Sequence, residues 1–233
     1  MPSSAASTPA VPRLAGRELV LVVPRALALA GGSWHGLRRG GVPQLLQSIR
    51  SAGEFRPRSE VESLPEWQQV IPHLVVRSDD RVLAMRRLQA GSERRLRGQV
   101  TIGVGGHINA TDGDLHQALG LGARREWAEE VVCDRDLAGR AVGLLKDDAG
   151  AVGQVHLGVL IMVDASGAEV EVRERDKLEG RMTALGDLGV FYLEMETWSQ
   201  FVYDAILAGE LEEAPAEALE IDLPALHGLA DRR

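Results

Sequence analysis

The chain has 233 residues, 45% of them hydrophobic, which is enough to bury one substantial core in a single folded unit with embellishments. Its formal net charge of -8, from 34 acidic and 26 basic residues, argues against a nucleic-acid-binding protein that relies on its overall field. The single cysteine, Cys133, excludes an intrachain disulfide framework and a metal site built on paired thiolates, so we expect a reducing, cytoplasmic setting.

The apolar patterning predicts a soluble protein without a membrane partner. The longest apolar stretches, residues 19–23 and 155–163, are far too short to cross a bilayer. Residues 1–12 are small and polar, and they lack the basic segment followed by an apolar segment that marks a signal peptide.

The first quarter of the chain predicts an αβ extension, residues 16–65, ahead of the main domain. Residues 1–15 are rich in Ser, Ala and Pro and predict a disordered tail. The run ELVLVV (residues 18–23) predicts a buried strand, and residues 42–49 have helical spacing after a glycine turn.

The centre of the chain predicts a hairpin followed by a strand, a loop and a helix. Residues 70–76 and 81–87 are β-like and are separated by the turn-forming residues 78–80. Residues 99–104 predict a strand that leads into a glycine-dense loop, and a helix is predicted from about residue 114 to residue 132.

The last third predicts three more strands and one amphipathic helix. The strands are expected at residues 152–163, 170–172 and 180–185, and the helix at residues 196–207. Residues 211–233 are rich in Ala, Glu and Leu, which leaves a short helix or a loose tail open.

Three glutamates on the central helix form the most informative cluster. Glu126, Glu129 and Glu130 stand at i, i+3 and i+4, so their carboxylates converge on one patch about one turn long. Three like charges at this spacing repel one another, and Mg²⁺ or Mn²⁺ is the natural neutralising ion because both prefer oxygen ligands. A solvated acidic helix face is the alternative for such spacing alone.

The order of the neighbouring elements favours a metal site over a solvated acidic helix face. The helical segment REWAEEVVC (residues 125–133) follows the loop GVGGHIN (residues 103–109). Together they resemble the signature of the Nudix (MutT-like) hydrolase family, G-x5-E-x7-R-E-U-x-E-E-x-G-U, with U aliphatic or aromatic. The family's first glutamate falls on Gln117, its first glycine on Thr111 and its last glycine on Val132, so we interpret the chain as a branch with a longer glycine loop.

The resemblance implies an α/β fold, a Nudix-type α/β/α sandwich around a mixed β-sheet with the N-terminal αβ extension added. The Nudix hydrolase domain would span residues 66–210. The implied activity is cleavage of a diphosphate (pyrophosphate) bond in a nucleoside diphosphate derivative or similar small molecule, by attack of a metal-activated water. The implied cofactor is Mg²⁺ or Mn²⁺.

Carried over residue by residue, the resemblance implies a metal site made of Glu126, Glu129, Glu130 and the backbone of Gly106. Arg125 would hold the glutamates in place by charge-assisted hydrogen bonds. The catalytic set would therefore be Glu129, Glu130 and Arg125, together with a general base on a later loop. Glu174 is the favoured base, and Glu179 and the helix glutamates remain candidates.

Contacts to the substrate are less well marked. His107 follows two glycines and would face the substrate or serve the loop as a structural histidine. Arg86 belongs to an arginine-rich stretch, residues 81–97, that would suit a phosphate-bearing ligand or form a solvated surface. His156 and Trp198 are expected in the core.

A second function stays open at this point. A Nudix-fold ligand-binding or regulatory module with weakened catalysis would account for the missing first glutamate and for Val132. The expected partner in both cases is a small-molecule diphosphate rather than nucleic acid, and a homodimer stays open.

Overall fold

The structure is a computed structural model that describes residues 18–87, 98–173 and 178–226. Its strands are β1 (Leu19–Pro24), β2 (Gly36–Arg39), β3 (Glu54–Pro57), β4 (Trp67–Ser78), β5 (Arg81–Arg87), β6 (Val100–Thr101), β7 (Val131–Cys133), β8 (Leu137–Lys146), β9 (His156–Asp164), β10 (Val170–Val172), β11 (Leu178–Ala184) and β12 (Leu219–Leu223). Its helices are α1 (Arg25–Ala28), α2 (Val42–Ala52), α3 (Arg58–Val61), α4 (Ala118–Glu130), α5 (Ala151–Val155), α6 (Leu185–Leu188) and α7 (Thr197–Leu207), with 3₁₀ turns η2 (Ala110–Asp112) and η3 (Gly189–Glu194).

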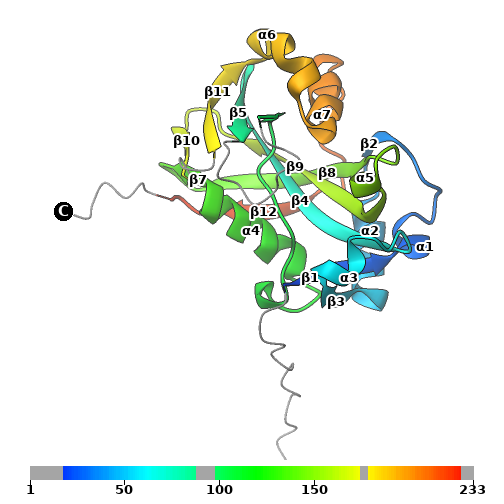
Figure 1. Cartoon of the computed structure of the whole chain (residues 1–233). Coiled ribbons are helices and arrows are strands. Elements are labelled where there is room, and N and C mark those ends of the chain that lie inside the picture. Colours follow the sequence, from blue (N-terminus) through cyan, green and yellow to red (C-terminus); the bar gives the residue numbers. More distant parts are fainter. Residues whose placement is uncertain (1–17, 88–97, 174–177, 227–233) are drawn as a thin grey trace, which may run out of the picture.

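A mixed sheet organises these elements, in the order β11-β5-β4-β9-β8-β12 (Figure 1). β4 and β9 run parallel, whereas the other neighbouring pairs of this series are antiparallel. Strand β1 pairs with both β3 and β4. The N-terminal region therefore shares one sheet with the later strands. The predicted α/β fold with a mixed sheet is therefore confirmed.

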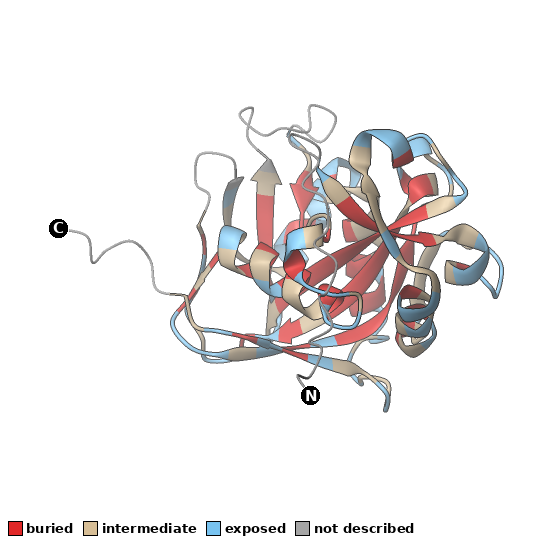
Figure 2. Ribbon diagram, turned by 90° about the horizontal axis from the view of Figure 1, so that it is seen from below, coloured by how far each residue is buried: buried red, intermediate tan, exposed pale blue. Residues whose placement is uncertain are grey.

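Helices cover both faces of the sheet because the central strands are apolar on both. Along β9, Leu157, Val159 and Ile161 pack with α2 and α4, while Leu160 between them packs with α7 on the opposite face. Successive side chains of a strand point to opposite faces of the sheet, and in β9 both faces are buried. Figure 2 shows the resulting buried layer along the central strands.

The predicted β4–β5 hairpin is confirmed, with Ser78 paired to Arg81 across the turn. Asp79 has φ 52°, a left-handed conformation that aspartate tolerates better than most residues. Helix α4 begins at Ala118, later than the predicted residue 114, because η2 and a turn precede it.

Three further stretches differ from the sequence expectations. Residues 131–132, expected at the end of the helix, begin strand β7. Residues 151–155 form helix α5 rather than the start of a strand, with the backbone N–H of Gln154 donating to the carbonyl of Gly150. The C-terminal region, expected as a short helix or loose tail, contributes β12, in which Ile221 and Leu223 are buried while Glu220 and Asp222 are exposed. That alternation is the signature of a strand, and only pairing with β8 makes it form.

Candidate active site

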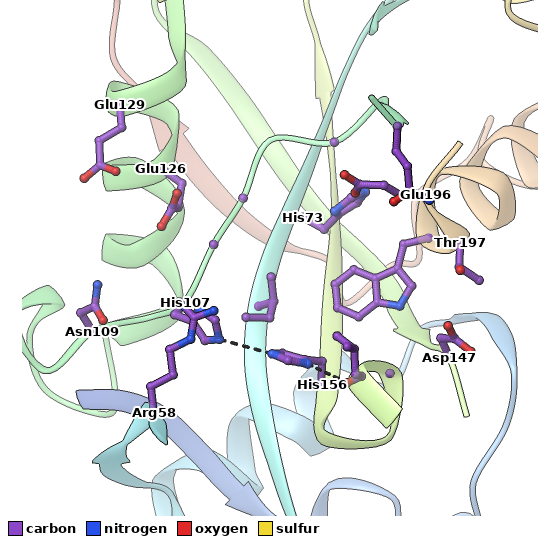
Figure 3. Close-up of a pocket in the computed structure, with 18 of the residues that line it drawn as sticks. Arg58, His73, His107, Asn109, Glu126, Glu129, Asp147, His156, Glu196 and Thr197 are labelled. Carbon is purple, nitrogen blue, oxygen red and sulfur yellow. Dashed lines mark hydrogen bonds between the residues drawn. The ribbon is translucent and has the colours of Figure 1, made fainter. Parts of the chain in front are cut away.

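A cavity of about 700 Å³ opens between the glycine loop, helix α4 and the N-terminal end of α7. That size is typical of small-molecule sites. Figure 3 shows the α4 carboxylates Glu126 and Glu129 on one side of it and Asp147, Glu196 and Thr197 on the other. Its lining residues are Glu18, Arg58, Ile71, His73, Gln99, Gly103, Gly105, Gly106, His107, Asn109, Arg125, Glu126, Glu129, Asp147, Val152, Gly153, His156, Glu196, Thr197 and Trp198.

The glycine loop lies against strand β4 and helix α4 at van der Waals distance. Leu74 and Val104 exchange two backbone hydrogen bonds of 2.8 Å, which fix the loop beside β4. A Cβ on Gly103 would lie 2.0 Å from the His73 ring, and one on Gly106 would lie 2.5 Å from Oε1 of Glu126. Glycine is therefore needed at these positions because backbone and side chain approach too closely for any other residue.

Arg125 organises the acidic end of the cavity. Its Nη1 donates to Oε1 of Glu126 at 2.7 Å and lies 3.3 Å from Oε1 of Glu129. Its Nη2 also donates to the carbonyl oxygen of His107 at 2.7 Å, which ties helix α4 to the glycine loop. One guanidinium thus fixes two carboxylates and the loop that faces them.

Asp112 is the buried partner of Arg125, and the sequence analysis missed it. Nε and Nη2 of Arg125 donate to the two carboxylate oxygens of Asp112 at 2.8 and 3.1 Å, a bidentate pair. The Asp112 side chain is 4% exposed. It precedes α4 in η2, so the acidic partner lies in the lengthened loop and not at Gln117, where the signature places its first glutamate.

Burial governs the electrostatics of this end. Glu126 is buried, and the loss of water raises the pKa of its carboxyl above the ordinary value, an effect that Arg125 partly opposes. Glu129 is half exposed at the cavity wall. The pair therefore offers one rigid, poorly hydrated carboxylate and one accessible carboxylate on the same helix face.

The floor of the cavity carries two histidines with assigned tautomers. Nδ1 of His156 lies 2.7 Å from the carbonyl oxygen of Val152, which can only accept, so this nitrogen bears the proton. Nε2 of His156 is then an acceptor for Nε2–H of His107 at 3.3 Å, and His107 also donates to Oε1 of Gln69 at 2.9 Å. Burial lowers the pKa of His107 to about 3, with Arg58 and His156 adding to the effect, so its ring is neutral.

The far end of the cavity is aromatic. Trp198 meets His73 edge to face, with ring centroids 5.7 Å apart, and its rim packs on Gly158, where a Cβ would lie 2.9 Å from the indole. The next residue, Ser199, is fully buried and accepts a hydrogen bond of 3.1 Å from the backbone N–H of Ile102. This contact joins α7 to the strand that leads into the glycine loop.

Comparisons with known proteins identify the family of the chain. No family model matches the sequence. Protein YmaB of Bacillus subtilis (strain 168) is 33% identical over 203 residues, 81% of this chain and 97% of YmaB. The crystal structure of Tm1382, a proposed Nudix hydrolase, superposes with a TM-score of 0.70 at 30% identity and covers 82% of this chain and 99% of its own. The chain belongs to the Nudix hydrolase family.

Membership confirms the family that the sequence resembles, and it makes the chain an enzyme of the pyrophosphohydrolase class. Within the part of this Nudix chain that the structure describes, no helix is both long and apolar enough to traverse a lipid bilayer.

The structure gathers only some of the site residues expected from the sequence. Gly106, His107, Arg125, Glu126 and Glu129 all line the cavity. Glu130 is the last residue of α4 and is not part of the cavity lining, and Glu174 lies outside the described residues.

Arg86 lies away from the cavity. On strand β5 its guanidinium donates to Glu194 at 2.8 Å and to the carbonyl of Gly98, and it lies over the Phe191 ring. These contacts direct the Arg86 side chain away from the cavity. Among the described residues, Arg58 of α3 lines the cavity together with Arg125. Strand register decides which way Arg86 points, and a one-residue shift would reverse it.

The carboxylates of the acidic end, Glu126 and Glu129, are oxygen donors of the kind that hard divalent cations prefer. In the described parts of the chain, no three His, Cys, Asp or Glu side chains lie close enough together to hold a metal ion. Mg²⁺ needs fewer, because one or two carboxylates commonly bind it together with waters and substrate phosphates. Glu126 and Glu129, with the backbone of Gly106 against the Glu126 carboxylate, fit that pattern.

A buried lysine supports the floor from behind. The side chain of Lys146 is fully buried, and its Nζ donates to the carbonyl oxygens of Gly153 and His156, the latter at 3.2 Å. Burial, reinforced by the charge of Arg25, lowers the pKa of this amine to about 8. Lys146 thereby holds the turn from α5 into β9 that places His156 in the cavity.

Because of Lys146, stability is expected to rise between about pH 8 and pH 10.5. In this window the unfolded chain keeps a proton that the folded amine has released, so rising pH favours the folded state by up to about 3 kcal/mol. Urea unfolding of wild type and Lys146→Met across this window would measure it, and the variant should lack the rise. Parallel curves for the two proteins would contradict the assignment.

Proposed function

We propose that this Nudix protein is a metal-dependent hydrolase that cleaves the diphosphate bond of a nucleoside diphosphate derivative with water. The observation that carries the proposal is the convergence of Glu126, Glu129 and the Gly106 backbone on one wall of the cavity, fixed by Arg125. Mg²⁺ or Mn²⁺ held there would supply charge neutralisation for the phosphate oxygens and a more acidic water.

The residues of the chain would contribute mainly position and charge. Phosphoryl transfer depends on holding the reacting groups in line and on stabilising charge on the phosphate oxygens. Arg58 lines the cavity near His107 (Figure 3), and its guanidinium pairs with Glu18 at 3.2 Å and with Glu62 at 2.9 Å, so it would add positive charge close to a bound phosphate. The neutral ring of His107 has Nδ1 free of a proton and would accept a hydrogen bond from substrate or water.

The proton of the attacking water needs an acceptor. Glu129 is accessible at the cavity wall and supports this role as well as metal binding. Glu174 remains a candidate, whereas Glu179 of β11 is not part of the cavity lining. Glu129→Gln and Glu174→Gln separate the two, because loss of a base alone lowers kcat while the affinity for Mn²⁺ persists.

The test is turnover of a panel of diphosphate compounds with Mg²⁺, with Mn²⁺ and with a chelator. Metal-dependent release of a nucleoside monophosphate is expected, with kcat/KM falling about 100-fold or more in Glu129→Gln. Glu220→Gln is the matched control, because Glu220 is exposed on β12 outside the cavity.

Either of two results would overturn the proposal. One is equal turnover with and without chelator. The other is the absence of turnover on every compound, combined with Mn²⁺ binding that is unchanged in Glu129→Gln; this second result would favour a ligand-binding module.

A further inference from the structure

The charges of the cavity are divided between its two ends. At the end beside the glycine loop, the described lining has two arginines, Arg58 and Arg125, and three carboxylates, Glu18, Glu126 and Glu129. Among the described residues that line the end around Trp198, Asp147 and Glu196 are carboxylates and none is a lysine or arginine. A phosphate would therefore meet arginines at the first end, where a divalent cation held by Glu126 and Glu129 would attract it further, whereas the carboxylates of the second end would repel it.

Trp198 provides a flat wall at the second end. The edge of the indole packs against Gly158 and His73. Trp198 lies in the first turn of α7, and Ser199 of the same turn forms hydrogen bonds with Thr101 of β6 and with Ile102. Such a rigid indole suits a planar ring, since base–aromatic stacking contributes about 1–3 kcal/mol per base. It does not by itself choose among rings, because every base has a π-face.

Asp147 and Glu196 would select among the possible rings. Oδ1 of Asp147 is occupied, by the backbone N–H of Ala149 at 3.0 Å and by Nδ1 of His35 at 3.3 Å. No hydrogen bond within the described chain reaches Oδ2. Ionised carboxylates are acceptors only, so a ligand at this end must present hydrogen-bond donors. A ring amino group satisfies a carboxylate, whereas a ring carbonyl placed there faces like partial charge.

We propose that the Trp198 end of the cavity binds the base of the nucleotide substrate and selects bases that carry an exocyclic amino group, through Asp147 and Glu196. This specificity rests on the proposed diphosphate hydrolase function, because it orients the substrate with its diphosphate at Glu126 and Glu129. The class of substrate is thus a cytidine, adenosine or guanosine diphosphate derivative rather than a uridine or inosine derivative, whose bases carry no exocyclic amino group.

Two matched pairs of compounds test the selection. CDP-glucose and UDP-glucose differ at position 4 of the base by amino against oxo, and ADP-ribose and IDP-ribose differ likewise at position 6. The amino member of each pair is expected to have at least about 10-fold higher kcat/KM, a difference of about 1.4 kcal/mol.

Variants assign the selection to residues. Asp147→Asn and Glu196→Gln should lower the amino-to-oxo ratio, because an amide can donate to the oxo group. Trp198→Leu should raise KM for both members and leave their ratio unchanged, while Glu220→Gln should change neither. Urea unfolding of each variant separates loss of specificity from loss of folding.

Binding of nucleoside monophosphates provides a readout that does not need catalysis. Calorimetric titration with CMP against UMP, and with AMP against IMP, in the presence of a chelator should show the same preference. Equal affinities together with equal turnover within each pair would overturn the selection while leaving the hydrolase intact. A binding preference without any turnover would leave the selection standing and remove the proposed function.

Discussion

Replacing Arg125 by leucine is expected to destabilise the protein by about 3–5 kcal/mol at neutral pH, the cost of leaving buried charges without their partner. Asp112 and Glu126 have side chains only 4% and 9% exposed, and both accept charge-assisted hydrogen bonds from this guanidinium. The carbonyl of His107 would lose its partner as well. Turnover should fall with stability, because the carboxylates and the glycine loop lose their common anchor.

The deficit of this variant should depend on pH in a defined direction. Burial already raises the pKa of Glu126, and removing Arg125 takes away the main opposing charge. A folded-state pKa raised above the unfolded value means that the cost develops as pH rises through about 4 and shrinks below it. Urea unfolding at several pH values would measure this.

Arg124→Leu is the matched control for Arg125→Leu. Arg124 is the preceding residue, half exposed, and it pairs with Asp222, whose side chain is 88% exposed. An exposed pair of this kind contributes about 0–1 kcal/mol, so this variant should remain close to wild type. Equal losses in the two variants would contradict the organising role of Arg125.

Gly106→Ala is expected to lower kcat/KM by about 100-fold, with a smaller loss of about 1–3 kcal/mol in stability. The new Cβ would lie 2.5–2.8 Å from the three carboxylate atoms of Glu126, so the loop or the carboxylate must move. The carboxylate is tied to Arg125 at 2.7 Å, and movement therefore disturbs the whole acidic end.

Gly120→Ala is the control for this substitution. Gly120 lies in α4, and a Cβ there would have no neighbour within 4 Å. Alanine in a helix interior is favoured over glycine by about 0.5–1 kcal/mol, so this variant should be active and slightly more stable. Wild-type turnover in Gly106→Ala would contradict the prediction. It would show that turnover does not depend on the close contact between the Gly106 backbone and the Glu126 carboxylate.

Much of the secondary structure could be predicted from local patterns. The hairpin of β4 and β5, strand β10 and helix α7 agree with the expected ranges because their periodicities of two and 3.6 residues are visible in short windows. Strands β2, β3 and β8 were not predicted, and β12 was expected as a tail or short helix. Their short or interrupted patterns become strands only when a neighbouring strand supplies hydrogen bonds.

The candidate site also has parts that the sequence predicted and parts that it could not. The sequence by itself determined the family resemblance and the convergence of Glu126 and Glu129, because residues three apart on a helix share a face whatever the helix packs against. It could not find Asp112 as the partner of Arg125, since the lengthened loop moves the acidic residue off the signature spacing.

The tertiary structure alone decided the second half of the cavity. Asp147 follows β8 and His156 begins β9, whereas Trp198 lies about forty residues later in α7, and only the packing of α7 on the sheet brings all three to one cavity. It also decided that Arg86 points to Glu194 and that Arg58 lines the cavity. Helix periodicity is a property of neighbouring residues, whereas strand register and the contacts between layers depend on the whole chain.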